Sequence, residues 1–134
     1  MKKLKAMMTF VLVALMAFTV QSCSDDDNND LKYKMTTSLK ITNPGDLTTT
    51  ECEAMIMAAK NEVIGEYSSD QAAIDATERS AQLMAEDLYL KKSQLKNTVM
   101  SFSFITTKMK TGAQIVTYYV DYNKGDINYY SNKN

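Results

Sequence analysis

The residues whose types and spacing most clearly define a chemistry lie at the junction VQSCSDDD, residues 20–27. Three lysines among the first five residues precede an apolar segment at 6–20, and the small residue Ser22 stands before Cys23. These are the parts of an export signal. The apolar segment is shorter than the roughly 20 residues that a membrane span needs, which favours a cleaved signal over a retained anchor helix. The pattern predicts attachment of lipid at Cys23.

This junction resembles the signal of bacterial lipoproteins, in which the cysteine becomes the first mature residue and carries acyl chains such as palmitate. The resemblance implies a signal peptide over residues 1–22 and a membrane anchor through the acyl chains on Cys23. The acids at 25–27 resemble those of Bacteroidetes lipoproteins, where such a run can accompany export to the cell surface. The implied location is the cell envelope at the outer membrane, with periplasmic or external orientation left open.

The charges of the chain concentrate near this junction. The full chain has a formal net charge of -1, which becomes -4 once the three lysines of the signal are removed. Residues 23–30 contain the acylated cysteine and four acids and no apolar side chain after Cys23, which predicts a solvated acidic tether. From residue 31 the charges cancel, so no basic surface indicates nucleic acid as a partner. Residues 31–134 are predicted to form a single domain.

The sequence contains no histidine, and this removes the commonest general base, the usual nucleophile pairs and imidazole metal ligands. The carboxylates of the domain are accounted for by helix capping, solubility and ion pairing. We therefore predict a protein that is not an enzyme, with no catalytic residues, no cofactor and no metal site.

Two local patterns leave an alternative open. Cys52 lies in the first turn of a predicted helix, where the helix dipole favours a reactive thiolate, but its place on an apolar stripe favours a small core residue. With Cys23 acylated, it has no partner for an internal disulfide. Residues 121–126 superficially resemble a calcium loop, but Gly125 comes one place early and Asn132 stands where glutamate is required. A hairpin turn is favoured there.

Hydrophobic periodicity predicts the elements that position these residues. Apolar and polar residues alternate over 31–42, which predicts a strand with one face exposed to solvent, and residues 43–46 end it. A capping box at Thr48 and Glu51 begins a helix that continues through Val63 to a stop at Gly65. Ser68 then caps a second helix, after which the period returns to two for strands from residue 98, at 114–122 and at 127–131.

These elements predict an α+β fold of the order β-α-α-β-β-β. The expected structure is an antiparallel sheet of three to four strands with a two-helix hairpin packed on one face. Because neighbouring strand residues point to opposite faces, some tyrosines must lie on the face away from the helices.

Tyr119 and Tyr130 are the candidate ligand or partner face among these tyrosines. The favoured function is a noncatalytic module that binds an envelope or secreted protein, as an accessory subunit or an inhibitor. The alternative is a surface lipoprotein that binds a glycan or a peptide through a tyrosine-lined sheet face. Ordinary strand propensity also accounts for the tyrosines.

Overall fold

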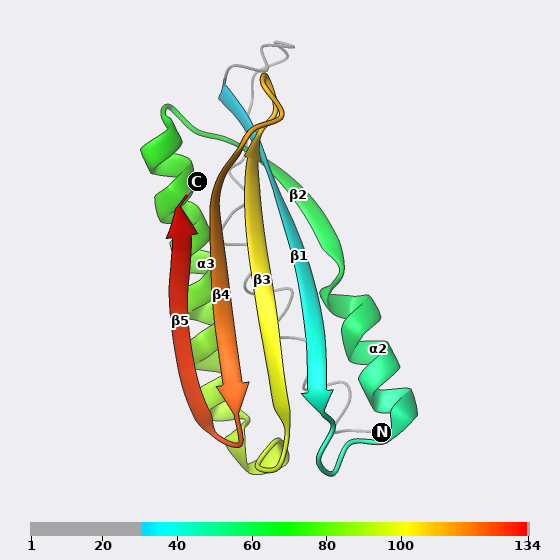
Figure 1. The fold of residues 1–134 in the computed structure, drawn as a ribbon. Coiled ribbons are helices and arrows are strands. Elements are labelled where there is room, and N and C mark those ends of the chain that lie inside the picture. The colour runs from blue at the N-terminus through cyan, green and yellow to red at the C-terminus, as the bar shows by residue number, and fades with distance from the viewer. Residues whose placement is uncertain (1–30, 134) are drawn as a thin grey trace.

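The computed structural model describes residues 31–133, which form one antiparallel sheet of five strands with two α-helices (Figure 1). The α+β class is confirmed. The elements are β1 (Lys32–Asn43), α2 (Thr49–Ala59), β2 (Asn61–Glu66), α3 (Asp70–Leu90), the short 3-10 helix η2 (Lys92–Gln94), β3 (Val99–Lys108), β4 (Gln114–Asn123) and β5 (Asp126–Lys133). Within this range no helix is long and apolar enough to cross a membrane.

The strands lie in the order β2-β1-β3-β4-β5, and every neighbouring pair is antiparallel. The first strand of the chain is thus an inner strand, with β2 on one side and β3 on the other. Ser38 of β1 pairs with Ser103 of β3, so residues far apart in the sequence meet at the centre of the sheet. β2 and β5 are the two edge strands.

Both helices pack on one face of the sheet, which we call the helix face. Thr37 of β1 donates a hydrogen bond from its hydroxyl to the carbonyl of Ala59 at the end of α2. Thr77 of α3 shares a buried hydrogen bond of 2.7 Å with Thr106 of β3. The hydrophobic core lies on this face, and its largest fully buried side chains are Tyr33, Tyr122, Phe102, Phe104, Met35, Met55, Met84, Leu88 and Leu95.

The capping box predicted for the first helix is confirmed. Thr48 Oγ1 accepts a hydrogen bond from the Glu51 backbone N–H at 3.1 Å, and Glu51 Oε1 accepts one from the Thr48 N–H at 2.9 Å. Two of the free amide groups at the helix start are satisfied in this way.

The predicted helical hairpin, and with it the count of three to four strands, is wrong. α2 ends at Ala59, and residues 61–66 form β2, which pairs with β1 from Lys32 to Thr37. Val63 continued the helical spacing of the apolar stripe, but it packs against the core from a strand instead. Pairing with β1 satisfies backbone groups that would otherwise lie at a sheet edge, and this outweighs the local helical pattern.

The second helix begins one residue later than predicted. Ser69, not Ser68, is the N-cap and accepts a hydrogen bond from the Ala72 N–H at 3.1 Å. The buried residues of α3 include most of the predicted stripe, with Thr77 and Leu88 among them. The helix therefore presents the face that its periodicity indicated.

The C-terminal strands form the expected meander. Lys124 and Gly125 have φ angles of +52° and +105°, which is the geometry of a tight two-residue hairpin turn between β4 and β5. The calcium-like segment at 121–126 is this hairpin. The last strand forms and extends beyond the predicted 127–131, from Asp126 to Lys133.

Candidate functional site

The predicted lipidation site, Cys23, lies outside the described residues. The same holds for the signal peptide at 1–22 and the acidic tether at 23–30. Acylation of Cys23 stays a prediction. The candidate surfaces below all belong to residues 31–133.

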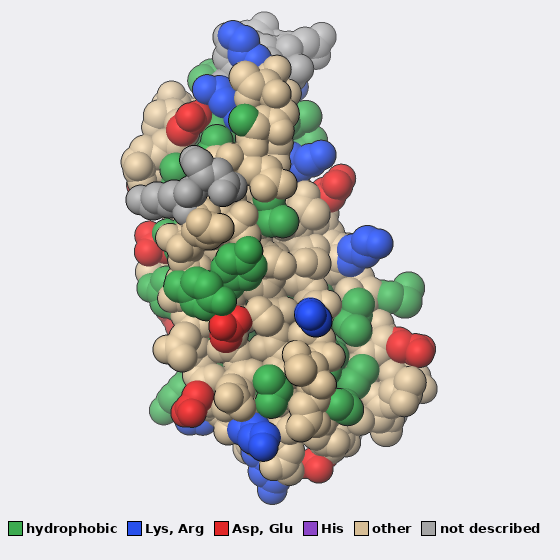
Figure 2. Space-filling model, in the orientation of Figure 1, with side chains coloured by type: hydrophobic (Ala, Val, Ile, Leu, Met, Phe, Trp, Pro, Cys, Tyr) green, Lys and Arg blue, Asp and Glu red, His purple; other side chains and the backbone are tan. Residues whose placement is uncertain are grey.

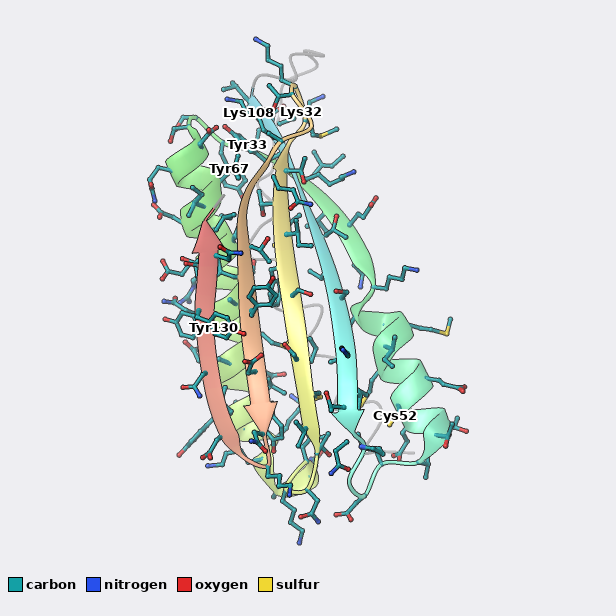
Figure 3. All side chains as sticks on the ribbon, viewed as in Figure 1. Lys32, Tyr33, Cys52, Tyr67, Lys108 and Tyr130 are labelled. Carbon is teal, nitrogen blue, oxygen red and sulfur yellow. The ribbon has the colours of Figure 1, made fainter. Side chains whose placement is uncertain are left out.

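Tyr119 and Tyr130 come from β4 and β5 and lie directly opposite each other in the register of the two strands. By strand alternation both side chains lie on the face opposite the helices, which we call the open face. Tyr130, labelled in Figure 3, is 49% exposed. The ring centroids are 5.2 Å apart and the planes are tilted by 30°. Partial burial raises the pKa of Tyr130, and the nearby Asp121 carboxylate raises it further.

The two rings are in contact but are not parallel, because the planes are tilted by 30°. The pair therefore offers a partner two adjacent aromatic rings rather than one flat platform. Around them, Ser38 and Ser103 share a hydrogen bond of 2.8 Å, and Ser101 donates one of 2.7 Å to Asp121. Figure 2 shows a mixed surface here, with hydrophobic side chains gathered over β4 and β5.

A second polar cluster lies at the end of the sheet where β1 begins (Figure 3). The Tyr33 hydroxyl donates a hydrogen bond of 2.6 Å to Asp70, whose carboxylate is also 3.2 Å from the Lys108 ammonium. Both interactions lower the pKa of Asp70, and the hydrogen bond from Tyr33 has the larger effect. Burial and then Asp70 raise the pKa of Tyr33 to about 12, and burial raises that of Tyr67 to about 12.

This cluster joins three elements but has no group suited to acid–base catalysis at neutral pH. Tyr33 is in β1, Asp70 begins α3 and Lys108 ends β3. A phenol with a raised pKa stays protonated, and a carboxyl with a lowered pKa stays ionised. The arrangement stabilises the contact between α3 and the sheet.

Cys52 is a partly buried free thiol packed against the core near the start of α2. Burial raises its pKa, and the neighbouring carboxylates of Glu51 and Glu53 raise it further. The thiolate is therefore disfavoured, because these effects act against the helix dipole. Of the two interpretations left open by the sequence, the geometry supports packing.

Within residues 31–133, no group of three or more Cys, Asp or Glu side chains is arranged to hold a metal ion. Some acids of the described region act in a helix cap or in ion pairs. Glu51 caps α2, and Lys91 contacts Asp87, four residues earlier on α3, at 2.7 Å.

An apolar surface that sequence reasoning missed lies between α3 and the edge strand β5. We call it the β5 groove; it is a cavity of about 550 Å³ lined by Ala85, Glu86, Tyr89, Leu90, Ile127 and Tyr129. Tyr89 and Leu90 are 64% and 76% exposed, although both are large and apolar. Their signal in the sequence is an apolar pair next to Leu88 that falls outside the buried stripe of the helix.

No family model, curated protein or solved structure matches this chain.

Proposed function

We propose that this protein is a noncatalytic lipoprotein of the cell envelope whose domain binds an envelope or secreted protein, as an accessory subunit or an inhibitor. The observation that carries the proposal is the cluster of exposed apolar side chains on α3 and β5, with Tyr89, Leu90 and Tyr129 at its centre. Large apolar and tyrosine side chains gathered on one surface favour contact with a protein, because their burial removes apolar area from water.

The proposed anchor leaves this surface free to bind. Asp70, the first residue of α3, contacts Tyr33 near the start of β1, the end of the domain to which the tether connects. The helix then runs away from that end for 21 residues, or about 30 Å, to Leu90. Acyl chains on Cys23 with an acidic tether at 23–30 would hold the β5 groove away from the membrane.

The anchor is tested by Cys23→Ala. We expect this variant to lose incorporation of radiolabelled palmitate and to remain unprocessed or leave the membrane fraction. Labelling that persists in the variant contradicts lipidation at this residue.

Partner binding is tested by chemical crosslinking of the lipidated protein in its native envelope, followed by purification through a C-terminal tag and mass spectrometry. One recurrent protein in stoichiometric amount is the expected result. Recovery of lipid alone contradicts the proposal. A Cys23→Ala sample, processed in parallel, identifies proteins captured without the anchor.

A second candidate function, binding of a glycan or a peptide on the open face, is favoured by the adjacent rings of Tyr119 and Tyr130. The exposed part of these rings is available to a sugar or an apolar side chain. Tyr119→Ala and Tyr130→Ala should then abolish retention on glycan or peptide arrays. Unchanged retention, or none in the unmodified protein, removes this candidate.

A further inference from the structure

We infer that the edge of β5, together with the β5 groove, receives an extended basic and apolar segment of the partner protein as a sixth strand. The inference rests on the proposed protein-binding function and specifies where and how the partner docks. An edge strand beside a helix with an apolar groove between them combines backbone hydrogen bonds with pockets for alternate side chains.

The first step is that β5 presents a row of available backbone groups. A two-residue turn closes on the hydrogen-bonded pair Asn123 and Asp126, so alternate residues of β5 point their N–H and C=O groups toward β4. The groups of Ile127, Tyr129 and Ser131 point outward instead. No described strand pairs with that side of β5.

The second step is that this edge lacks the protection found at the other edge. β2 has six residues and carries Glu62 and Glu66, and short, charged edges discourage pairing. β5 has eight residues, and between Asp126 and Lys133 none is charged. The difference favours β5 as the edge that accepts a strand.

The third step is that the side chains of an added strand would meet the groove. Ile127 and Tyr129 point to the helix face, and Tyr129 is 40% exposed because α3 covers it only in part. Gln82 of α3 donates a hydrogen bond of 2.9 Å to the Tyr129 hydroxyl and holds that ring at the groove. Alternate apolar residues of an added strand would cover Leu90 and Tyr89.

The fourth step concerns charge. Among the described residues that line the β5 groove, only Glu86 has a charged side chain. The Tyr89 ring already has the Lys92 ammonium 4.7 Å from its centroid, so a further cation is expected at Glu86 rather than at the ring. A partner segment with Lys or Arg neutralises the Glu86 carboxylate, whereas residues 126–132 of β5 in a second copy contain no Lys or Arg to do so.

The test selects binders to the full-length lipoprotein in detergent from a phage-displayed library of random linear peptides. Enriched peptides should alternate apolar residues and contain at least one Lys or Arg. On binding, exchange of the backbone amides of Ile127, Tyr129 and Ser131 should slow by at least about tenfold. Failure to enrich such peptides, or protection elsewhere in the domain, overturns the inference.

Variants separate the backbone and side-chain contributions. Ser131→Pro removes an outward N–H, and Leu90→Ser removes an exposed apolar contact; each should weaken the selected peptide by about tenfold or more. Met57→Ser is the matched control, since Met57 on α2 is also 76% exposed, and it should leave affinity unchanged. If Ser131→Pro fails to fold, Leu90→Ser alone tests whether the peptide binds at the β5 groove.

The charge argument has its own variant. Glu86→Gln should remove the preference of the selected peptides for basic residues, and a retained preference contradicts the role of Glu86.

Two further outcomes overturn the inference without affecting the proposed function. A photo-crosslinker at Tyr130 that captures the envelope partner, while the same group at Leu90 captures nothing, would place the partner on the open face. Light scattering that shows a dimer lost in Ser131→Pro would assign the edge to a second copy. By contrast, absence of any partner in the envelope contradicts the proposed function itself.

Discussion

At the scale of single residues, the described domain uses its polar groups to fix elements in place. Asp70 accepts a hydrogen bond from the Tyr33 hydroxyl and forms an ion pair with Lys108. The Tyr122 hydroxyl donates a hydrogen bond of 2.8 Å to the carbonyl of Leu95. The hydroxyls of Tyr33 and Tyr122, whose side chains are buried, find their partners in this way. Conversely, the exposed Leu90 adds nothing to the core, and this is why it is a candidate for contact with a partner.

Ionisation of Tyr33 at alkaline pH should lower the folding stability of the domain. Its pKa is raised from 10 to about 12 in the folded state, so the protonated form is favoured by folding. The associated stability is fully present below pH 10 and is lost as the pH rises toward 12. Tyr33→Phe should remove the part of the alkaline loss that Tyr33 causes, about 3 kcal/mol for a pKa that moves from 10 to about 12, and leave the part that Tyr67 causes.

The measurement is urea unfolding at a series of pH values for both proteins. Tyr89→Phe, which changes a ring that is 64% exposed, is the control and should leave stability at neutral pH unchanged. If wild type and Tyr33→Phe lose stability in parallel between neutral and strongly alkaline pH, the raised pKa of Tyr33 is wrong.

At the scale of elements, connections decide how α2 and the meander fit against the sheet. The turn after β1 brings Gly45 against Asn97, which lies just before β3. Thr98, which follows Asn97, donates a hydrogen bond of 3.2 Å from its hydroxyl to the carbonyl of Pro44. The loops at this end of the sheet are therefore held together by close backbone contact, and glycine allows it.

Gly45 and Gly112 offer a matched comparison of this effect. Both have positive φ angles, +60° and +75°, so alanine is strained at either position. A Cβ at Gly45 would lie 2.5 Å from the Asn97 carbonyl carbon, whereas one at Gly112 has nothing within 4 Å. Gly112→Ala should cost about 1 kcal/mol of unfolding free energy, and Gly45→Ala more than about 2 kcal/mol. Equal losses in urea denaturation would contradict the close approach.

For the molecule as a whole, the inner position of β1, between β2 and β3, joins both halves of the chain into one unit. β1 pairs with β2 from the first half and with β3 from the C-terminal meander (Figure 1). Neither half has a complete sheet without this strand. The domain should therefore unfold as a single cooperative unit.

Met35 of β1 tests this cooperativity, because it is fully buried between the sheet and the helices. Met35→Ala should lower the unfolding free energy by about 2–4 kcal/mol. Far-ultraviolet and near-ultraviolet circular dichroism should shift together to the same lower urea midpoint. Val120→Ala, equally buried in β4, should behave in the same way. A second transition that only one of the variants moves would show separate folding units.

The features that could be predicted from the sequence are those that depend on local periodicity and hydrogen bonding. The alternation of 31–42 and of the C-terminal strands, the capping box of Thr48 and Glu51 and the meander all follow from neighbours within a few residues. Alternation along a strand also predicts that some tyrosines, such as Tyr119 and Tyr130, lie on the face away from the helices. That these two lie directly opposite each other depends on the register of β4 and β5. The lipoprotein signal is likewise a local pattern, and acylation of Cys23 remains to be measured.

Which segments pair and which surfaces remain free depends on contacts that form only in the folded domain. Residues 61–66 carry a pattern compatible with helix or strand, and pairing with β1 selects the strand. The β5 groove exists because α3 covers β5 incompletely while β5 lies at the sheet edge. Such features depend on contacts between residues distant in the chain, where backbone pairing and burial outweigh local preference.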